Sequence, residues 1–358
     1  LLLYLKKRTQ IDNEKLRAAI SYDLNDDEGN QLTEHEKERI ISALEKVKIL
    51  DPACGSGAFP IGALQKIVFI LQHADPVGQL WFKKQINNTS PELKRVIERE
   101  FAHKNFDYIR KLGIIRENIY GVDIQPIATE ISRLRCFLTL VVDERIQEDL
   151  ENRGIEPLPN LDFKFVTANS LIGLPGSQEN SQIGLFEDDA GIKELKELRD
   201  MFFNASGTER DQLKLQFVQA QNRMFQRLIS EGIRGHADLT TKLSTWDPFS
   251  HKASSWFDPE WMFGIKEGFD IVIANPPYVD SEQMVRSEPK LRELYTKVFT
   301  TAKGNWDLFV IFIENGLQLL KKGGTLTFII PNKLLSANYT NHLRKFLLTF
   351  SIQEIRDY

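Results

Sequence analysis

The chain has 358 residues, of which 42% are hydrophobic and 27% are charged, and its formal net charge is −4. This length and hydrophobic content suffice for a large folded domain, and no apolar run reaches the length of a membrane-spanning helix. The two cysteines and six scattered histidines offer neither a disulfide framework nor the ligand spacing of a zinc site. We therefore expect a cytoplasmic protein with no metal site and no membrane association.

The first 47 residues are predicted to form a helical lead-in to the main domain. Residues 3–20 have the pattern of a single helix, and residues 23–30 are polar and predict a loop. Thr33 and Glu36 have the spacing of a capping box, in which each side chain bonds a backbone N–H near the start of a helix. This box predicts a helix that runs to about Lys46.

From residue 48 to 358 the pattern alternates between short apolar strands and helices. This alternation predicts an α/β fold with a doubly wound, mostly parallel sheet. Residues 178–262 are predicted to form a helical insertion, within which 191–230 have the pattern of a helical hairpin. The predicted strands lie near residues 48–50, 118–122, 163–166, 269–274, 325–330 and 352–357.

The first predicted strand is followed by a glycine-containing turn, Asp51-Pro52-Ala53-Cys54-Gly55-Ser56-Gly57-Ala58-Phe59, and by a helical pattern from Pro60. Gly55 and Gly57 permit a tight turn and a close approach of backbone to a ligand. The turn lacks the third glycine of the pyrophosphate fingerprint and the Gly-Lys-Ser/Thr of a P-loop. Asp51 at the strand end would repel a phosphate but suits a ligand with an ammonium group, such as S-adenosylmethionine.

The next two predicted strands end in residues that suit the same ligand. Asp123 follows the second strand, where a carboxylate can accept hydrogen bonds from both ribose hydroxyls, and Pro126 opens the next helix. Asn169 follows the third strand and is predicted to bond the adenine amino group. Ile124 or Leu171 would pack on the adenine ring.

The strand predicted over Phe269–Ala274 ends abruptly in Asn275-Pro276-Pro277-Tyr278. The prolines cannot continue a strand ladder and stiffen the turn. A carboxamide, a fixed carbonyl and an aromatic ring are therefore held at the carboxyl end of a central strand, where open α/β sheets bind ligands. This group suits gripping a planar ring and presenting its amino nitrogen for reaction.

The three motifs, in this order, resemble DNA adenine-N6 methyltransferases of the gamma arrangement, in which the cofactor motif precedes the catalytic one. The residues of these motifs resemble those of the large bacterial type II enzymes that join restriction and modification in one polypeptide. The resemblance covers roughly residues 32 to 358 and includes the stretches 119–138, 256–264 and 304–309. It implies a Rossmann-like fold and S-adenosylmethionine as cofactor. It also implies double-stranded DNA as partner, with the target adenine flipped out.

The resemblance also assigns roles to particular residues. Asn275, Pro276, Pro277 and Tyr278 would be catalytic. Cys54 and Cys136 carry no catalytic role and are expected to be small core residues. The cofactor would be bound by Asp51, Ala53, Cys54, Gly55, Ser56, Gly57, Phe59, Asp123, Ile124, Asn169, Ser170 and Leu171.

Three departures from the family pattern are expected to concern segments outside this chain. Residues 31–50 lack the aromatic-Tyr-Thr-Pro segment that related enzymes carry before the cofactor motif. No nuclease constellation and no target recognition domain are evident, so both are expected elsewhere on the same full-length polypeptide. The mildly basic stretch 281–303 is predicted to be either a phosphate-contacting or closing loop or a solvated helix face.

Alternative functions share parts of this pattern. The same catalytic tetrapeptide serves enzymes that methylate glutamine in release factors and others that modify RNA bases. A catalytically idle scaffold that binds DNA or a partner is a further alternative. The residue sequence of the glycine turn and the large insertion favour DNA as the substrate. The intact Asn275-Pro276-Pro277-Tyr278 argues against an idle scaffold.

Overall fold

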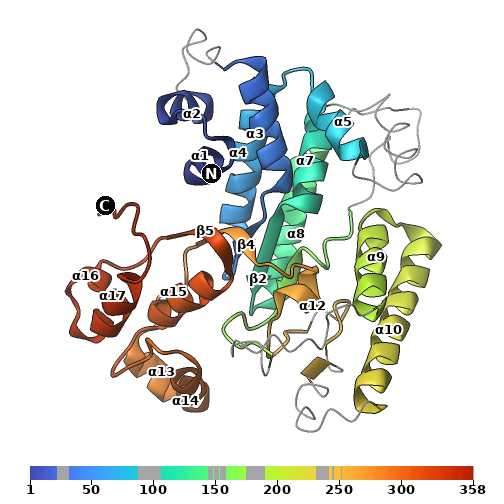
Figure 1. The fold of residues 1–358 in the computed structure, drawn as a ribbon. Coiled ribbons are helices and arrows are strands. Elements are labelled where there is room, and N and C mark those ends of the chain that lie inside the picture. Colours follow the sequence, from blue (N-terminus) through green and yellow to red (C-terminus); the bar gives the residue numbers. More distant parts are fainter. Residues whose placement is uncertain are drawn as a thin grey trace.

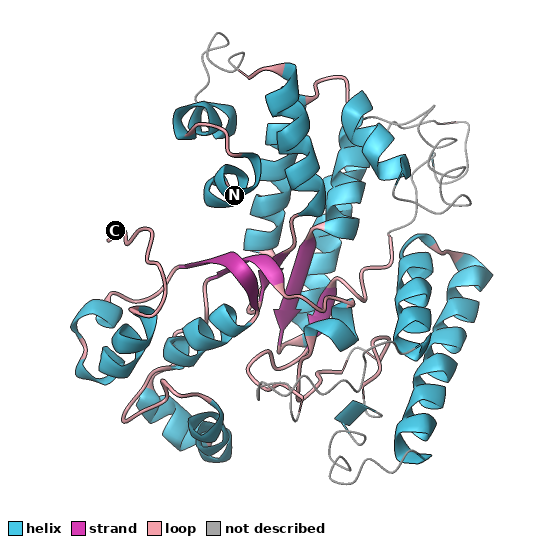
Figure 2. Ribbon diagram, viewed as in Figure 1, coloured by secondary structure: helices cyan, strands magenta, loops and turns pink. Residues whose placement is uncertain are grey.

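The computed structural model describes residues 1–21, 32–87, 106–143, 148, 153, 159–174, 190–230, 242–243, 246–250 and 252–357. Its strands are β1 (Ile49–Asp51), β2 (Ile119–Asp123), β3 (Phe165–Thr167), β4 (Phe269–Ala274) and β5 (Leu320–Phe328). They form one parallel five-stranded sheet in the order β3-β2-β1-β4-β5 (Figures 1 and 2). The predicted doubly wound, parallel α/β fold of the Rossmann-like type is thus confirmed.

Strand order reverses at β1, which pairs with β2 on one side and with β4 on the other. Asp51 is aligned with Gly121 of β2, and Leu50 is aligned with Val272 of β4. The carboxyl ends of these three strands therefore lie in a row at one edge of the sheet. An edge of this kind, at a switch in strand order, is the usual ligand site of an open parallel sheet.

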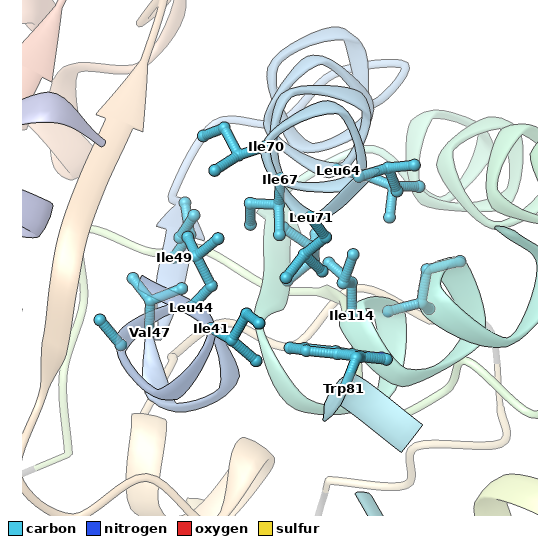
Figure 3. Packing of buried hydrophobic residues seen from close by; sticks show 14 of the residues in the cluster. Ile41, Leu44, Val47, Ile49, Leu64, Ile67, Ile70, Leu71, Trp81 and Ile114 are labelled. Carbon is cyan, nitrogen blue, oxygen red and sulfur yellow. The ribbon is translucent and has the colours of Figure 1, made fainter. Parts of the chain in front are cut away.

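One face of the sheet is covered by α4 (Ala58–Ala74), α7 (Phe106–Glu117) and α8 (Pro126–Val141), with α3 (Glu34–Lys46) and α5 (Gln79–Asn87) outside them. Ile49 of β1 and Ile271 of β4 point into this layer because alternate strand residues face opposite sides. Figure 3 shows side chains of α3, α4 and α7 meeting in this core, with the Trp81 indole of α5 beside them.

The other face carries a second core, into which Leu50 and Val272 point. It includes α12 (Pro259–Phe263) and the helical pair α9 (Ala190–Asn204) and α10 (Gly207–Ser230). These two helices lie side by side, as the spacing in residues 191–230 predicts (Figure 1). Aromatic side chains dominate this core; Phe163 packs against Phe202 and Phe217 with ring centroids 5.7 and 4.9 Å apart.

The segment after β4 packs around β5. Its helices are α13 (Ser281–Ser287), α14 (Pro289–Val298), α15 (Leu308–Gln318), α16 (Lys333–Ser336) and α17 (Asn341–Leu347), with the 3-10 helix η3 (Asn338–Thr340). α15 is buried along most of its length and contacts β5. The basic stretch 281–303 is thus mainly two short helices with exposed outer faces rather than a loop.

The prediction of one helix over residues 3–20 is wrong. Two helices, α1 (Leu2–Thr9) and α2 (Asn13–Ile20), stand there instead. Gln10 ends α1 in the left-handed conformation with φ 53°, and the Asp12 side chain caps α2 by accepting from the backbone N–H of Glu14 at 2.8 Å. A cap of this kind stops one helix and starts another within three residues.

The remaining predictions for the two ends of the chain and for the fifth strand have mixed outcomes. The Thr33–Glu36 capping box is present, whereas the predicted loop 23–30 lies outside the described residues. The fifth strand begins at Leu320, earlier than the predicted 325–330. The predicted strand 352–357 is wrong: these residues are exposed, have no regular secondary structure and pair with none of the described strands. Within the described residues no helix is both long and apolar enough to cross a bilayer.

The tight packing between β2 and β3 generates a stability prediction. A Cβ added at Gly121 would lie 2.7 Å from the Phe165 ring and 3.0 Å from the Cys54 sulfur. Gly121→Ala should therefore destabilise the fold by about 1–3 kcal/mol, since overpacking forces neighbours off their preferred positions. Urea unfolding followed by circular dichroism measures this change.

Gly62 provides the matched control. It lies in α4 with open space around the added Cβ. Gly62→Ala should stabilise the protein by about 0.5–1 kcal/mol because alanine favours the helix. Equal effects at the two glycines would contradict the packing described for Gly121.

Candidate functional site

The turn between β1 and α4 is built by two glycines with positive φ. Gly55 has φ 52° and Gly57 has φ 82°, a region that favours glycine. The Gly57 N–H donates to the Cys54 carbonyl at 2.8 Å, and Gly57 then caps α4. A Cβ at Gly57 would lie 2.9 Å from the Ser132 hydroxyl, whereas a Cβ at Gly55 meets nothing within 4 Å. The turn is thus closed toward α8 and open at Gly55.

Asp51 lies beneath this turn and is 1% exposed. Its Oδ1 accepts from the backbone N–H of Ala53 at 3.0 Å. Its Oδ2 is buried and has no hydrogen-bond partner among the described residues. Burial raises the pKa of Asp51 to about 8. The unpartnered oxygen is an acceptor that a cation or an N–H donor would satisfy.

Asp123 at the end of β2 connects that strand to the glycine turn. Its Oδ2 accepts from the Gly55 N–H at 2.9 Å, and its Oδ1 accepts from the Gln125 N–H at 2.9 Å. Asp123 remains partly exposed, and each carboxylate oxygen can accept a further hydrogen bond. Ile124, directly after it, is 53% exposed and presents an apolar surface at the same edge.

The polar side chains of the loop after β3 make more hydrogen bonds within the protein than the sequence predicts. Asn169 is buried; its Nδ2 lies 3.0 Å from the Tyr295 hydroxyl, and its Oδ1 accepts from the Leu171 N–H at 3.1 Å. The Ser170 hydroxyl donates to the Pro52 carbonyl at 2.7 Å, which ties this loop to the glycine turn. The carboxamide of Asn169 is therefore bonded within the protein, and its predicted contact with adenine stays a prediction.

The remaining predicted cofactor residues differ in exposure. Cys54 is buried, and burial raises the pKa of its thiol, so it is a core residue, as expected, and not a reactive thiolate. Cys136 is also buried, which raises the pKa of its thiol to about 12. Ala53, Ser56 and Phe59 are half-buried around the turn.

The four predicted catalytic residues follow β4 directly. Asn275 is exposed, and its carboxamide is bonded by none of the described residues. Pro276 is buried and Pro277 is exposed. Tyr278 is 56% exposed, and its hydroxyl donates to the Ile329 carbonyl at 3.3 Å. A free carboxamide and an accessible ring thus stand at the carboxyl end of β4, the strand next to β1.

A model of the Eco57I restriction-modification methylase family matches residues 117–358. The chain belongs to this family. The match includes Asp123 and Asn275 to Tyr278, and it confirms the predicted resemblance to restriction-modification methyltransferases.

Three relatives named as methyltransferases agree. The putative type II restriction enzyme and methyltransferase RM.MjaORFECS2P of Methanocaldococcus jannaschii is 27% identical over 91% of this chain and 29% of its own length. The type II restriction enzyme and methyltransferase RM.Eco57I of Escherichia coli is 25% identical over 84% of this chain and 21% of its own. The adenine-specific methyltransferase BrxX of Escherichia coli is 25% identical over 78% and 21%. The chain spans less than a third of each relative.

Three supporting residues of this methylase domain carried no predicted role. Ser132 donates to the Gly55 carbonyl at 3.0 Å, and Tyr295 bonds Asn169. Asp307 accepts from the Ser281 N–H at 3.1 Å and from the Tyr339 hydroxyl, so it anchors the start of α13 after the Asn275–Tyr278 loop. Asp307 lies in the stretch 304–309 that carries the family resemblance, which is the one signal that pointed to it.

Asp51 generates a prediction about the pH dependence of stability. The folded carboxyl keeps its proton up to about pH 8, whereas the unfolded carboxyl releases it near pH 3.8. Its contribution to stability is therefore fully present below pH 3.8 and is lost as pH rises to about 8. Asp51→Asn should flatten this decline in the free energy of unfolding, measured by urea titration at pH 5 and pH 8.

Replacement of an exposed acid, Glu282→Gln, serves as control and should leave the decline in place. If Asp51→Asn and the wild type lose the same free energy between pH 5 and pH 8, the carboxyl does not titrate as its burial implies.

Proposed function

We propose that this domain transfers the methyl group of S-adenosylmethionine to the N6 amino group of adenine in DNA, as the modification activity of a restriction-modification system. The observation that carries the proposal is the position of Asn275 and Tyr278 at the end of β4, one strand from the glycine turn of β1. Membership of the restriction-modification methylase family supports DNA as substrate, and the relative BrxX carries adenine specificity in its name.

The residues around the glycine turn fit S-adenosylmethionine. The unpartnered Oδ2 of Asp51 suits the ammonium group of the methionine moiety, whose charge favours the ionised carboxyl. The backbone at Gly55 is open to a ligand, and the free acceptor positions of Asp123 suit the ribose hydroxyls. Exposed Ile124 offers an apolar face for the adenine ring. When bound, this cofactor supplies an electrophilic methyl group on its sulfonium.

At the target base the chain contributes acceptors and a stacking surface. The exocyclic nitrogen of adenine is a poor nucleophile because its lone pair is delocalised into the ring. Asn275 Oδ1 and the Pro276 carbonyl would each accept one N–H bond, which favours a pyramidal nitrogen and stabilises the positive charge that develops on it. Tyr278 would stack on the base after it leaves the duplex. No strong base is required, since the methylated nitrogen becomes acidic and loses its proton late.

The alternative functions are distinguished by the molecule that becomes methylated. An RNA-base or glutamine methyltransferase would use the same tetrapeptide on a different substrate, and an idle scaffold would bind without transfer. Tritiated methyl transfer to duplex DNA by the complete natural polypeptide, followed by nucleoside analysis, should yield N6-methyladenine. A product of 5-methylcytosine, or labelled protein with unlabelled DNA, would contradict the proposal. Target recognition and any nuclease activity are proposed for other parts of that polypeptide.

Asp123 tests the cofactor site. Asp123→Ala should weaken binding of S-adenosylmethionine by about 1–3 kcal/mol, because charged hydrogen bonds to the ribose are lost. Asp123→Asn, which keeps one acceptor oxygen, should lose less. Isothermal titration calorimetry measures both affinities, and an unchanged affinity in Asp123→Ala removes the ribose assignment.

Asn275 separates binding from chemistry. Asn275→Ala should leave the affinity for S-adenosylmethionine nearly intact and lower the rate of methyl transfer by about 10²-fold or more, because one of two acceptors for the amino group is lost. Asn341→Ala, which removes an exposed carboxamide from α17, is the matched control. Full activity in Asn275→Ala is incompatible with the mechanism.

Tyr278 should depend on its ring and not on its hydroxyl. The hydroxyl makes only the 3.3 Å bond to Ile329, so Tyr278→Phe should retain much of the methyl-transfer activity. Tyr278→Ala should lose capture of the flipped base, since stacking on an aromatic ring contributes about 1–3 kcal/mol per base. Methyl-transfer rates over a range of DNA concentrations distinguish the two variants, and equal losses would contradict a stacking role.

A further inference from the structure

A cleft of about 530 Å³ lies far from the Asn275 loop, at the amino ends of the strands. It is bounded by residues of α1, α3, α5 and the start of β5; α1, α3 and α5 are in the upper half of Figure 1. Lys321, the second residue of β5, is one of its lining residues, whereas Asp123 and Asn275 stand at the carboxyl ends of β2 and β4. The lining residues are Tyr4, Arg8, His35, Glu38, Arg39, Ser42, Ala43, Lys46, Lys84 and Lys321.

The charge of this cleft is unbalanced. Five lining side chains are cationic at neutral pH and one, Glu38, is anionic, although the whole chain has a net charge of −4. A concave surface with one sign of charge concentrates the potential and attracts ions of the opposite sign. The cleft is therefore a positively charged region on a chain whose net charge is negative.

Internal partners account for only part of this charge. Asp270, which is 2% exposed, pairs with Arg8 at 3.5 Å and with Lys321, and it also accepts from the Lys48 N–H at 3.0 Å. A single carboxylate cannot neutralise two cations, and the Arg8 side chain is still 54% exposed. Lys84 donates to the Ser42 hydroxyl at 2.8 Å, which is a neutral partner.

Arg39 and Lys46 are the free cations of the cleft. Neither makes an ion pair or side-chain hydrogen bond with any residue of the described ranges. They stand seven positions apart on one face of α3, about 10 Å along the helix axis. With Lys84 of α5 they bring three positive charges to the cleft, more than one phosphate group carries, so a ligand with several phosphates in series matches this charge better than a single phosphate does.

We propose that this cleft binds a ligand that carries several phosphate groups, held by Arg39, Lys46 and Lys84. Guanidinium and ammonium groups form short, charge-assisted hydrogen bonds to phosphate oxygens. The two possible sources of such a ligand are a free nucleotide and the backbone of DNA. The site is separate from the methyl-transfer site, so it does not depend on the function proposed above.

The test uses the 358-residue chain and three probes in magnesium-free buffer: inorganic tripolyphosphate, ATP and a short DNA duplex. Calorimetry should detect binding of tripolyphosphate, and the affinity should fall as salt rises. Arg39→Gln combined with Lys46→Gln should weaken it by about tenfold or more, since two charge-assisted contacts are lost. Thermal unfolding checks that the variant is folded. Lys83→Gln, an exposed neighbour outside the cleft, should bind as the wild type does.

Each outcome decides the proposal. Loss of tripolyphosphate and ATP binding in the double variant supports it and identifies a free nucleotide as the source. An additional loss of duplex binding identifies the DNA backbone. Absence of tripolyphosphate binding by the wild type, or equal binding by the double variant, overturns it. Unchanged affinity of the double variant for S-adenosylmethionine keeps this result distinct from the methyl-transfer site.

Discussion

The parallel pairing of β1 with β2 on one side and β4 on the other is the constraint on which the site depends. Parallel strands end at the same edge of a sheet, so the turn after β1, the carboxylate after β2 and the tetrapeptide after β4 meet although more than two hundred residues separate Asp51 from Asn275. The hydrogen bond from Gly55 N–H to Asp123 joins two of these segments directly. Shortening or misaligning β1 would separate all three.

Sequence patterns were sufficient where one physical feature dominates a segment. The apolar runs of β1 to β4 are short and buried and are followed within three residues by proline or asparagine, so the predicted position of each agrees with the structure to within two residues. The Thr33–Glu36 box was recognised because its two reciprocal bonds need particular residue types at one spacing. The same reasoning failed for residues 3–20, where a single left-handed residue, Gln10, breaks a continuous hydrophobic pattern.

Features that depend on contacts between distant segments could not be read from the sequence. The bond between Asn169 and Tyr295 joins residues 126 positions apart, and the pattern around either residue gives no sign of the other. The raised pKa of Asp51 follows from its burial beneath the glycine turn, whereas the sequence shows only an acid at a strand end. The basic cleft has the same origin, since it draws cations from α1, α3, α5 and β5.

The contact between Asn169 and Tyr295 has a thermodynamic consequence. Asn169 belongs to the loop beside the glycine turn, whereas Tyr295 lies on α14, in the segment that follows the Asn275–Tyr278 loop. A molecule that displaces the Tyr295 hydroxyl from the Asn169 carboxamide would change the free energy with which α14 is held. By reciprocity, a contact that displaces α14 changes the affinity for that molecule by the same factor. One buried hydrogen bond thus couples the loop after β3 to α14, on the far side of the Asn275–Tyr278 loop along the chain.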